Sequence, residues 1–175
     1  MIRPLKLRDG VTLLVVVALL LTGAWIWSRP VGLAQVPDVA LTSLDGQTLR
    51  FAAMRGQPML VTFWATTCPS CVKEMPHLVE LYHELAPRGL QMVGVAMYYD
   101  VPEDIRTLVR LRQLPYIIGH DADGSVGRAF GNVILTPTTF LVAADGRIVY
   151  QRVGEADITQ LRTTLLGLLP GGART

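Results

Sequence analysis

Hydrophobic residues are distributed along this chain in two distinct ways. Residues 11–27 form one apolar run of 17 positions without a charge, and three basic residues precede it. From residue 38 onward, short apolar runs of strand length alternate with longer segments that repeat at helical spacing. The pattern predicts an apolar N-terminal segment followed by one α/β domain.

The second region predicts a definite order of elements. The runs MLVTFW and LQMVGVAM are typical of central strands covered on both faces. Asp45-Gly46 and Asp145-Gly146 are turn signals, each between two strand-like runs. We expect strands at 39–42, 47–51, 59–64, 90–97, 116–118, 138–143 and 147–152, and helices or helical turns at 52–55, 69–86, 102–113, 125–130 and 155–169. This order favours an α/β sandwich with parallel central strands and an antiparallel edge.

The N-terminal run has nearly the length of a membrane span. A helix of 17 residues rises about 25 Å, close to the lower limit for crossing a bilayer. Arg3, Lys6 and Arg8 precede it, which places the N-terminus inside and the rest of the chain outside. We therefore expect a cytoplasmic segment at 1–10 and a transmembrane anchor at 11–27. A cleaved signal peptide remains the alternative, with small residues near positions 22–24 and 32–34 available for cleavage.

Composition narrows the function classes. Residues 28–37 contain two prolines and read as a linker, so the folded domain should occupy residues 38–175. Half of the chain is hydrophobic, which excludes a disordered protein. Its 16 Lys and Arg residues nearly balance 14 Asp and Glu residues, so charge does not indicate nucleic-acid binding. Two cysteines are too few for a disulfide scaffold or a four-cysteine zinc site.

The two cysteines carry the clearest chemical signal. Cys68 and Cys71 follow a buried strand directly and open a helix, so both lie on one helix face within reach of a disulfide. Cys68 is placed at the helix N-terminus, where the macrodipole stabilises a thiolate. Cys71 is one turn further in and is suited to resolving a mixed disulfide. A stapling disulfide is a weak alternative because so short a loop constrains little. A metal site is also weak, because His77, His83 and His120 do not cluster in the sequence.

The segment FWATTCPSCVKEMP at 63–76 resembles the membrane-anchored, thioredoxin-fold disulfide reductases of the TlpA/ResA type. MRGQP at 54–58 and LTPTTF at 135–140 extend the resemblance, which covers about residues 38–169. It implies an α/β, thioredoxin-like three-layer sandwich with an N-terminal β-hairpin extension, preceded by one transmembrane helix.

The resemblance also implies roles for single residues. Cys68 would attack and Cys71 would resolve, as a redox-active disulfide. Pro137 would be a cis proline that exposes the backbone of Thr136 to a bound polypeptide, although an ordinary strand-edge proline is the alternative. Glu74 would handle protons near the thiols, unless it is a solvated helix carboxylate.

Four further positions belong to this reading of the sequence. Trp64 is expected beside the cysteines, as part of the substrate site. Pro76 matches the position that kinks the first helix. Thr62 stands where thioredoxins have a buried aspartate, and Thr67 stands where many relatives have tryptophan.

The implied function is reduction of protein disulfides in the bacterial periplasm by a chain anchored in the inner membrane. No cofactor and no metal are expected, and electrons would come from a membrane thiol carrier of the DsbD/CcdA type. Cytochrome c maturation is one possible process. Two alternatives stay open: a copper-binding assembly factor that uses both cysteines and His120, and a disulfide-forming oxidase that differs only in redox poise. CxxC spacing disfavours copper, since such relatives have CxxxC.

Overall fold

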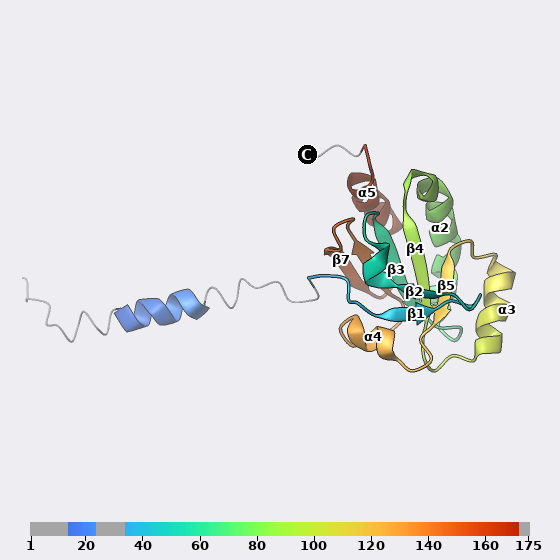
Figure 1. Cartoon of the computed structure of the whole chain (residues 1–175), viewed down its shortest axis with the longest axis horizontal. Helices are drawn as coiled ribbons and strands as arrows, with labels where there is room; N and C mark the ends of the chain where they lie inside the picture. Colours follow the sequence, from blue (N-terminus) through green and yellow to red (C-terminus); the bar gives the residue numbers. More distant parts are fainter. Residues whose placement is uncertain (1–13, 24–33, 172–175) are drawn as a thin grey trace, which may run out of the picture. The chain divides into compact units, whose positions relative to one another are not determined.

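The computed structural model describes residues 14–23 and 34–171, which belong to two separate units. Residues 14–23 are helical, and residues 34–171 form the α/β domain (Figure 1). The other residues of the expected segments 1–10, 11–27 and 28–37 lie outside the described residues. In the part of the chain that is described, no helix combines the length and the apolar character needed to cross a bilayer.

The domain is organised around a five-stranded mixed sheet. Its strands are β3 (Met59–Trp64), β4 (Gln91–Ala96), β5 (Ile117–His120), β6 (Thr138–Val142) and β7 (Ile148–Val153), arranged in the order β5-β4-β3-β6-β7. The pairs β3–β4 and β4–β5 are parallel, and the pairs β3–β6 and β6–β7 are antiparallel. Every residue of β3 and β6 is buried, as their continuous apolar runs require. The predicted parallel centre and antiparallel edge are confirmed.

Two helices lie side by side on one face of the sheet. They are α2 (Pro69–Leu85) and α5 (Ile158–Leu168), joined by an ion pair of 2.8 Å between Arg162 and Glu84 (Figure 1). Side chains of α2 meet Thr62 and Trp64, which alternate along β3 with residues that are buried on the opposite face of the sheet. The domain has two more α-helices among the described residues, α3 (Pro102–Arg112) after β4 and α4 (Ser125–Ala129) after β5.

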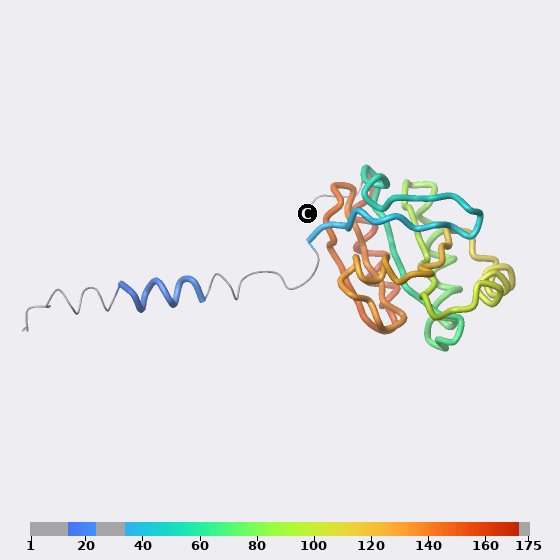
Figure 2. Tube along the Cα trace, turned by 60° about the horizontal axis from the view of Figure 1, so that its bottom comes forward, coloured from blue at the N-terminus to red at the C-terminus, as the bar shows by residue number. Residues whose placement is uncertain are grey.

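The opposite face of the sheet is covered by a hairpin and by aromatic packing. The hairpin consists of β1 (Ala40–Thr42) and β2 (Thr48–Arg50), and a 3-10 turn at Phe51–Met54 follows it. In Figure 2 the cyan hairpin reaches the yellow part of the chain, where Ser43 bridges Gly119 in β5. Four phenylalanines pack edge to face beneath it, with ring centroids 4.9–5.9 Å apart: Phe51, Phe63, Phe130 and Phe140. These layers confirm the expected three-layer sandwich with an N-terminal hairpin.

Some predicted boundaries are wrong for local reasons. Helix α5 begins at Ile158 rather than 155, because the Asp157 carboxylate caps it by accepting from the Gln160 N–H at 3.0 Å. Strand β5 is Ile117–His120 rather than 116–118, since its pairing with β4 continues to His120. Helix α2 continues through Pro76 to Leu85.

Gly94 provides a test of the packing between the sheet and the active-site face. A Cβ at this position would lie 2.6 Å from Ile118 Cδ1 and 3.1 Å from Trp64 Nε1. We expect Gly94→Ala to lower the free energy of unfolding by about 1–3 kcal/mol, because overpacked cores are strained. Urea denaturation of the oxidised protein measures this change.

Gly167 in α5 is the matched control, since a Cβ there meets nothing within 4 Å. Gly167→Ala should be neutral or stabilise the domain by up to about 1 kcal/mol, because alanine favours helix. Equal effects of the two substitutions would contradict the proposed packing constraint.

Candidate active site

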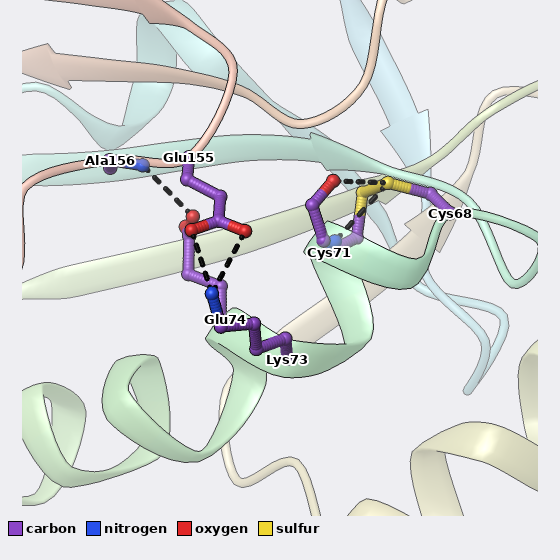
Figure 3. A network of polar contacts seen from close by, with 7 residues as sticks. Cys68, Cys71, Lys73, Glu74, Glu155 and Ala156 are labelled. Carbon is purple, nitrogen blue, oxygen red and sulfur yellow. Dashed lines mark hydrogen bonds and ion pairs between the residues drawn. A yellow bond between two sulfur atoms is a disulfide. The ribbon is translucent and has the colours of Figure 1, made fainter.

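The two sulfurs lie at the junction between β3 and α2. Cys68 and Cys71 form a disulfide with an S–S distance of 2.04 Å and a Cα–Cα distance of 5.3 Å. Cys68 is the N-cap of α2, and its Sγ accepts the backbone N–H of Cys71 at 3.2 Å (Figure 3). Pro69 follows at the start of the helix, where its missing N–H costs nothing. The free amides of the first helical turn therefore point at Cys68 and stabilise its thiolate after reduction.

The cysteines differ in exposure in the order that their chemistry requires. Cys68 is 8% exposed, whereas Cys71 is 3% exposed. An attacking sulfur must reach a second protein, and a resolving sulfur needs to reach only its neighbour. The difference is small, but it agrees with attack by Cys68.

Pro137 lies beside the disulfide although it is 66 positions beyond Cys71 in the chain. Its bond to Thr136 is cis, as the resemblance implies. Pro137 and Cys71 line the same small cavity, together with Trp64. Thr136 is half-buried, and its neighbours Ile134 and Leu135 are exposed. The structure therefore brings the expected substrate-binding residues to the redox pair.

Glu74 is a buried carboxylate one helical turn after Cys71. Only 5% of the residue is exposed, and its Oε2 accepts the backbone N–H of Ala156 at 3.0 Å (Figure 3). Oε1 is buried and has no hydrogen-bond partner among the described residues. Burial raises the pKa of Glu74 above its ordinary value of 4.5, and the Glu155 carboxylate adds to this rise. The hydrogen bond from Ala156 and the nearby His77 act in the opposite direction.

A cavity of about 10 Å³ separates Glu74 from the sheet. Its lining consists of Thr62, Trp64, Cys71, Glu74, Met75, Leu78, Tyr116 and Pro137. The volume is about that needed for a single water molecule, roughly 10–15 Å³. Trp64 Nε1 is buried here without a partner in the described part of the chain, as is Glu74 Oε1. The cavity thus combines an apolar wall, an unpaired donor and an unpaired acceptor next to the resolving sulfur.

One loop ties α2 to the cis proline. The N–H of Gly154 donates to the carbonyl of Pro137 at 2.8 Å, and two residues later Ala156 donates to Glu74. Between them, Glu155 forms an exposed ion pair of 3.2 Å with Lys73. This loop was not predicted, because the helix was expected to begin at residue 155. The only sequence signal for it is Asp157, a residue type that favours the N-cap position.

Asp100 is a second buried carboxylate that sequence reasoning missed. It follows β4 and accepts two hydrogen bonds from Thr66, which lies two residues before Cys68. Its place after a parallel strand neighbouring β3 was the available signal, since the carboxyl ends of parallel strands share one edge of the sheet.

The histidines do not gather at the cysteines. His77 and His83 are exposed on α2, and His120 ends β5. Across residues 14–23 and 34–171, no group of three or more His, Cys, Asp or Glu side chains is arranged to hold a metal ion. The described geometry therefore offers no support for the copper alternative.

Comparison with known proteins places this geometry in a family. The model of the Redoxin family matches residues 32–165. ResA from Bacillus anthracis, a thiol-disulfide oxidoreductase, is 28% identical over 137 residues, which are 78% of each chain. DsbE from Vibrio cholerae, a thiol:disulfide interchange protein, is 32% identical over 136 residues, covering 76% of this chain and 71% of DsbE.

Solved structures agree with this assignment. DsbF from Mycobacterium tuberculosis superposes with a TM-score of 0.69 at 25% identity, covering 75% of this chain and 95% of DsbF. A thiol:disulfide interchange protein from Chlorobium tepidum has a TM-score of 0.70 at 24% identity, over 81% of this chain and 97% of its own, and supports the fold alone. With a disulfide at the N-terminus of α2 and a cis proline beside it, the chain belongs to the Redoxin family and is a thiol-disulfide oxidoreductase of the ResA and DsbE type.

Proposed function

We propose that this enzyme reduces disulfides in other proteins on the outer side of a bacterial inner membrane. The observation that carries the proposal is the position of Cys68, at the N-cap of α2 and bonded to Cys71, which lines one cavity with Pro137. A thiolate at a helix N-terminus is a competent nucleophile. Thr136, which directly precedes Pro137 and is half-buried, offers its backbone to an extended polypeptide, as the resemblance implies.

The reaction proceeds in two exchanges. The Cys68 thiolate attacks one sulfur of the substrate disulfide, so that a mixed disulfide forms and the other substrate sulfur leaves as a thiolate. Cys71 then attacks Cys68 Sγ, which forms the Cys68–Cys71 disulfide and releases the second substrate thiolate. Two electrons pass to the substrate, and its two thiolates take up the two protons that Cys68 and Cys71 lose.

We assign to Glu74 the role of accepting the proton that Cys71 loses in the resolving step. Cys71 must lose its proton before it attacks, and the cavity beside it contains the unpaired Oε1 of Glu74. Burial raises the pKa of this carboxyl towards that of a thiol, which makes proton exchange between the two less costly. Trp64 supplies a rigid wall of the same cavity, adjacent to the substrate-binding residues.

The resolving role of Cys71 predicts that its removal traps the substrate. In Cys71→Ala, Cys68 still attacks, but the mixed disulfide has no internal thiol to release it. Turnover should fall by about two orders of magnitude or more, and covalent complexes with exported proteins should accumulate. Non-reducing electrophoresis and mass spectrometry of material trapped in the native compartment measure both.

Cys68→Ala is the control and should trap nothing. Absence of trapped protein in Cys71→Ala would contradict the assignment of a protein substrate. The direction of transfer is tested by equilibrium with glutathione, for which a reductant should have a potential far below the roughly −120 mV of a strong oxidant such as DsbA. A potential near that value would instead establish the oxidase alternative.

Glu74→Gln separates proton transfer from packing. Glutamine keeps an oxygen that accepts from Ala156 but cannot take a proton from Cys71. We expect the rate of the resolving step to fall by about 10²-fold, the lower end of what a positioned acid or base contributes. Stopped-flow measurement of mixed-disulfide decay gives this rate, and Glu80→Gln, an exposed change on the same helix, should leave it unchanged.

The same pair of variants tests the raised pKa through stability. The native state binds more protons than the unfolded chain between the ordinary value of 4.5 and the raised folded pKa of Glu74. The cost of burying the ionised carboxyl is therefore fully present above the folded pKa and is lost as pH falls towards 4.5. Glu74→Gln should be relatively most stable at neutral pH, with an advantage that shrinks on acidification. An advantage independent of pH would contradict an ionised, buried Glu74.

We further propose that residues 11–27 anchor the enzyme, with residues 1–10 in the cytoplasm and the catalytic domain in the periplasm. The supporting features are the uncharged run and the basic residues Arg3, Lys6 and Arg8 before it. The full chain should remain in the membrane fraction after alkaline extraction, and protease should degrade its domain in spheroplasts. A mature protein whose mass lacks the first 20–35 residues, roughly the length of a signal peptide, would instead establish cleavage.

We assign the supply of electrons that reduce the Cys68–Cys71 disulfide again to a membrane thiol carrier of the DsbD/CcdA type. An exported disulfide must be reduced again after each cycle, and an oxidising compartment lacks a soluble reductant for it. The resemblance to the TlpA/ResA type supports apocytochrome c as one substrate class, whose reduced cysteine pair is required for haem attachment.

A further inference from the structure

Asp100 is bound tightly to the loop that leads into Cys68. Its Oδ2 accepts the backbone N–H of Thr66 and its Oδ1 accepts the Thr66 hydroxyl, both at 2.8 Å. Only 6% of the residue is exposed, and within residues 14–23 and 34–171 it forms no ion pair. A buried carboxylate without a counter-ion depends on such charge-assisted hydrogen bonds. The two bonds to Thr66 therefore strongly favour one position of both residues.

The surrounding backbone makes Asp100 a fixed point. The N–H of Asp100 donates to the Met97 carbonyl at 3.0 Å and closes a turn, and the N–H of Met97 donates to the Trp64 carbonyl at 3.0 Å. Helix α3 begins two residues after Asp100 and is held to the core by its fully buried Ile105. Asp100 is thus attached to β3 on one side and to an anchored helix on the other.

The loop that Asp100 contacts is buried at its ends, Ala65 and Cys68, whereas Thr66 is half-buried and Thr67 is exposed. Residues 65–68 form a turn in which the N–H of Cys68 donates to the Ala65 carbonyl at 3.1 Å. Thr66 is inside this turn, so fixing both its N–H and its hydroxyl fixes the direction in which the chain enters Cys68. Cys71 is buried in the core as part of α2, and Cys68 is joined to the same helix by the N–H of Val72, which donates to the Cys68 carbonyl at 3.1 Å.

We propose that Asp100 is a positioning residue that fixes the Ala65–Cys68 turn and thereby holds the Cys68 sulfur within bonding reach of Cys71. The distance between two thiols sets their effective concentration, and effective concentration sets how strongly the disulfide is favoured over the dithiol. This role adds a positioning residue to the proposed function, and it rests on that function only for the exchange chemistry at Cys68. It makes the dithiol–disulfide equilibrium depend on a residue that touches neither sulfur.

Equilibrium with glutathione measures this effect directly. Oxidised glutathione takes two electrons from the Cys68–Cys71 dithiol, so that one protein disulfide and two reduced glutathione molecules form. We expect Asp100→Ala to shift this equilibrium about tenfold towards the dithiol, which corresponds to roughly 30 mV for a two-electron couple. Asp100→Asn should shift it less than about threefold, since its amide can accept from the Thr66 N–H and donate to the Thr66 hydroxyl.

A matched control comes from the next strand. Asp121 is also buried, and its carboxylate accepts the N–H groups of Val126 and Gly127 at 2.9 and 2.8 Å, but these bonds hold α4. Asp121→Ala should lower the free energy of unfolding and leave the glutathione equilibrium unchanged. An equal shift in Asp121→Ala and Asp100→Ala would mean general destabilisation and would overturn the proposal.

Two other variants test the same contact if Asp100→Ala does not fold. Thr66→Val removes only the hydroxyl contact, so it should give a smaller shift in the same direction, and no shift would overturn the proposal. A shift in Asp100→Asn as large as that of Asp100→Ala would assign the effect to charge rather than position, which also overturns it. Failure to reduce any protein disulfide, with these glutathione results intact, would refute only the proposed substrate.

Discussion

The N-terminus of α2 is the constraint on which the active site depends. The parallel strand β3 delivers the chain to one edge of the sheet, and the helix that follows presents its free amides there. Cys68 is the residue that occupies this position, so its sulfur caps the helix and is stabilised as an anion by it. A pair of cysteines with the same spacing further along α2 could still form a disulfide, but neither sulfur would receive this stabilisation.

The remaining parts of the site are arranged around that helix by contacts between segments distant in the sequence. The loop from Gly154 to Ala156 connects the carbonyl of Pro137 to the carboxylate of Glu74, so the substrate-binding proline and the buried acid share one short piece of backbone. Asp100 makes a similar connection between the end of β4 and the turn before Cys68. Each connection includes a hydrogen bond that a backbone N–H donates. The geometry of that bond therefore depends on a flexible side chain at one end at most.

The layered fold and the redox pair could be predicted from the sequence because their signals are local. MLVTFW is apolar at every position but one, and the CxxC motif follows it directly, so strand, helix and chemistry are read from 13 consecutive residues, 59–71. Pro137 and Glu74 were found only through resemblance to a family. The proximity of Pro137 to Cys71 depends on how β6 pairs with β3, and the burial of Glu74 depends on the loop before α5, neither of which a local pattern encodes.

Asp100 and the loop at 154–156 were missed for a related reason. Asp100 reads as a polar residue after a strand, and only the parallel pairing of β3 with β4 brings it to Thr66. Glu155 and Ala156 have helical propensity, so the helix was predicted to include them. The stronger effect is capping by Asp157, which makes the helix begin after it and leaves the Ala156 N–H free to bind Glu74.

The source of the buried acid distinguishes this site from that of a thioredoxin. The β3 position where thioredoxins have an aspartate is Thr62, whose hydroxyl accepts that of Thr139 in β6 at 3.3 Å. That oxygen is committed to a neighbouring strand and cannot serve as a base, yet Thr62 lines the same cavity as Glu74 and Cys71. The cavity therefore still contains one carboxylate, contributed by α2 rather than by the sheet. Because Glu74 shares its helix with Cys71, the acid and the resolving sulfur keep their separation even if α2 shifts against the sheet when the disulfide opens, which a strand residue could not ensure.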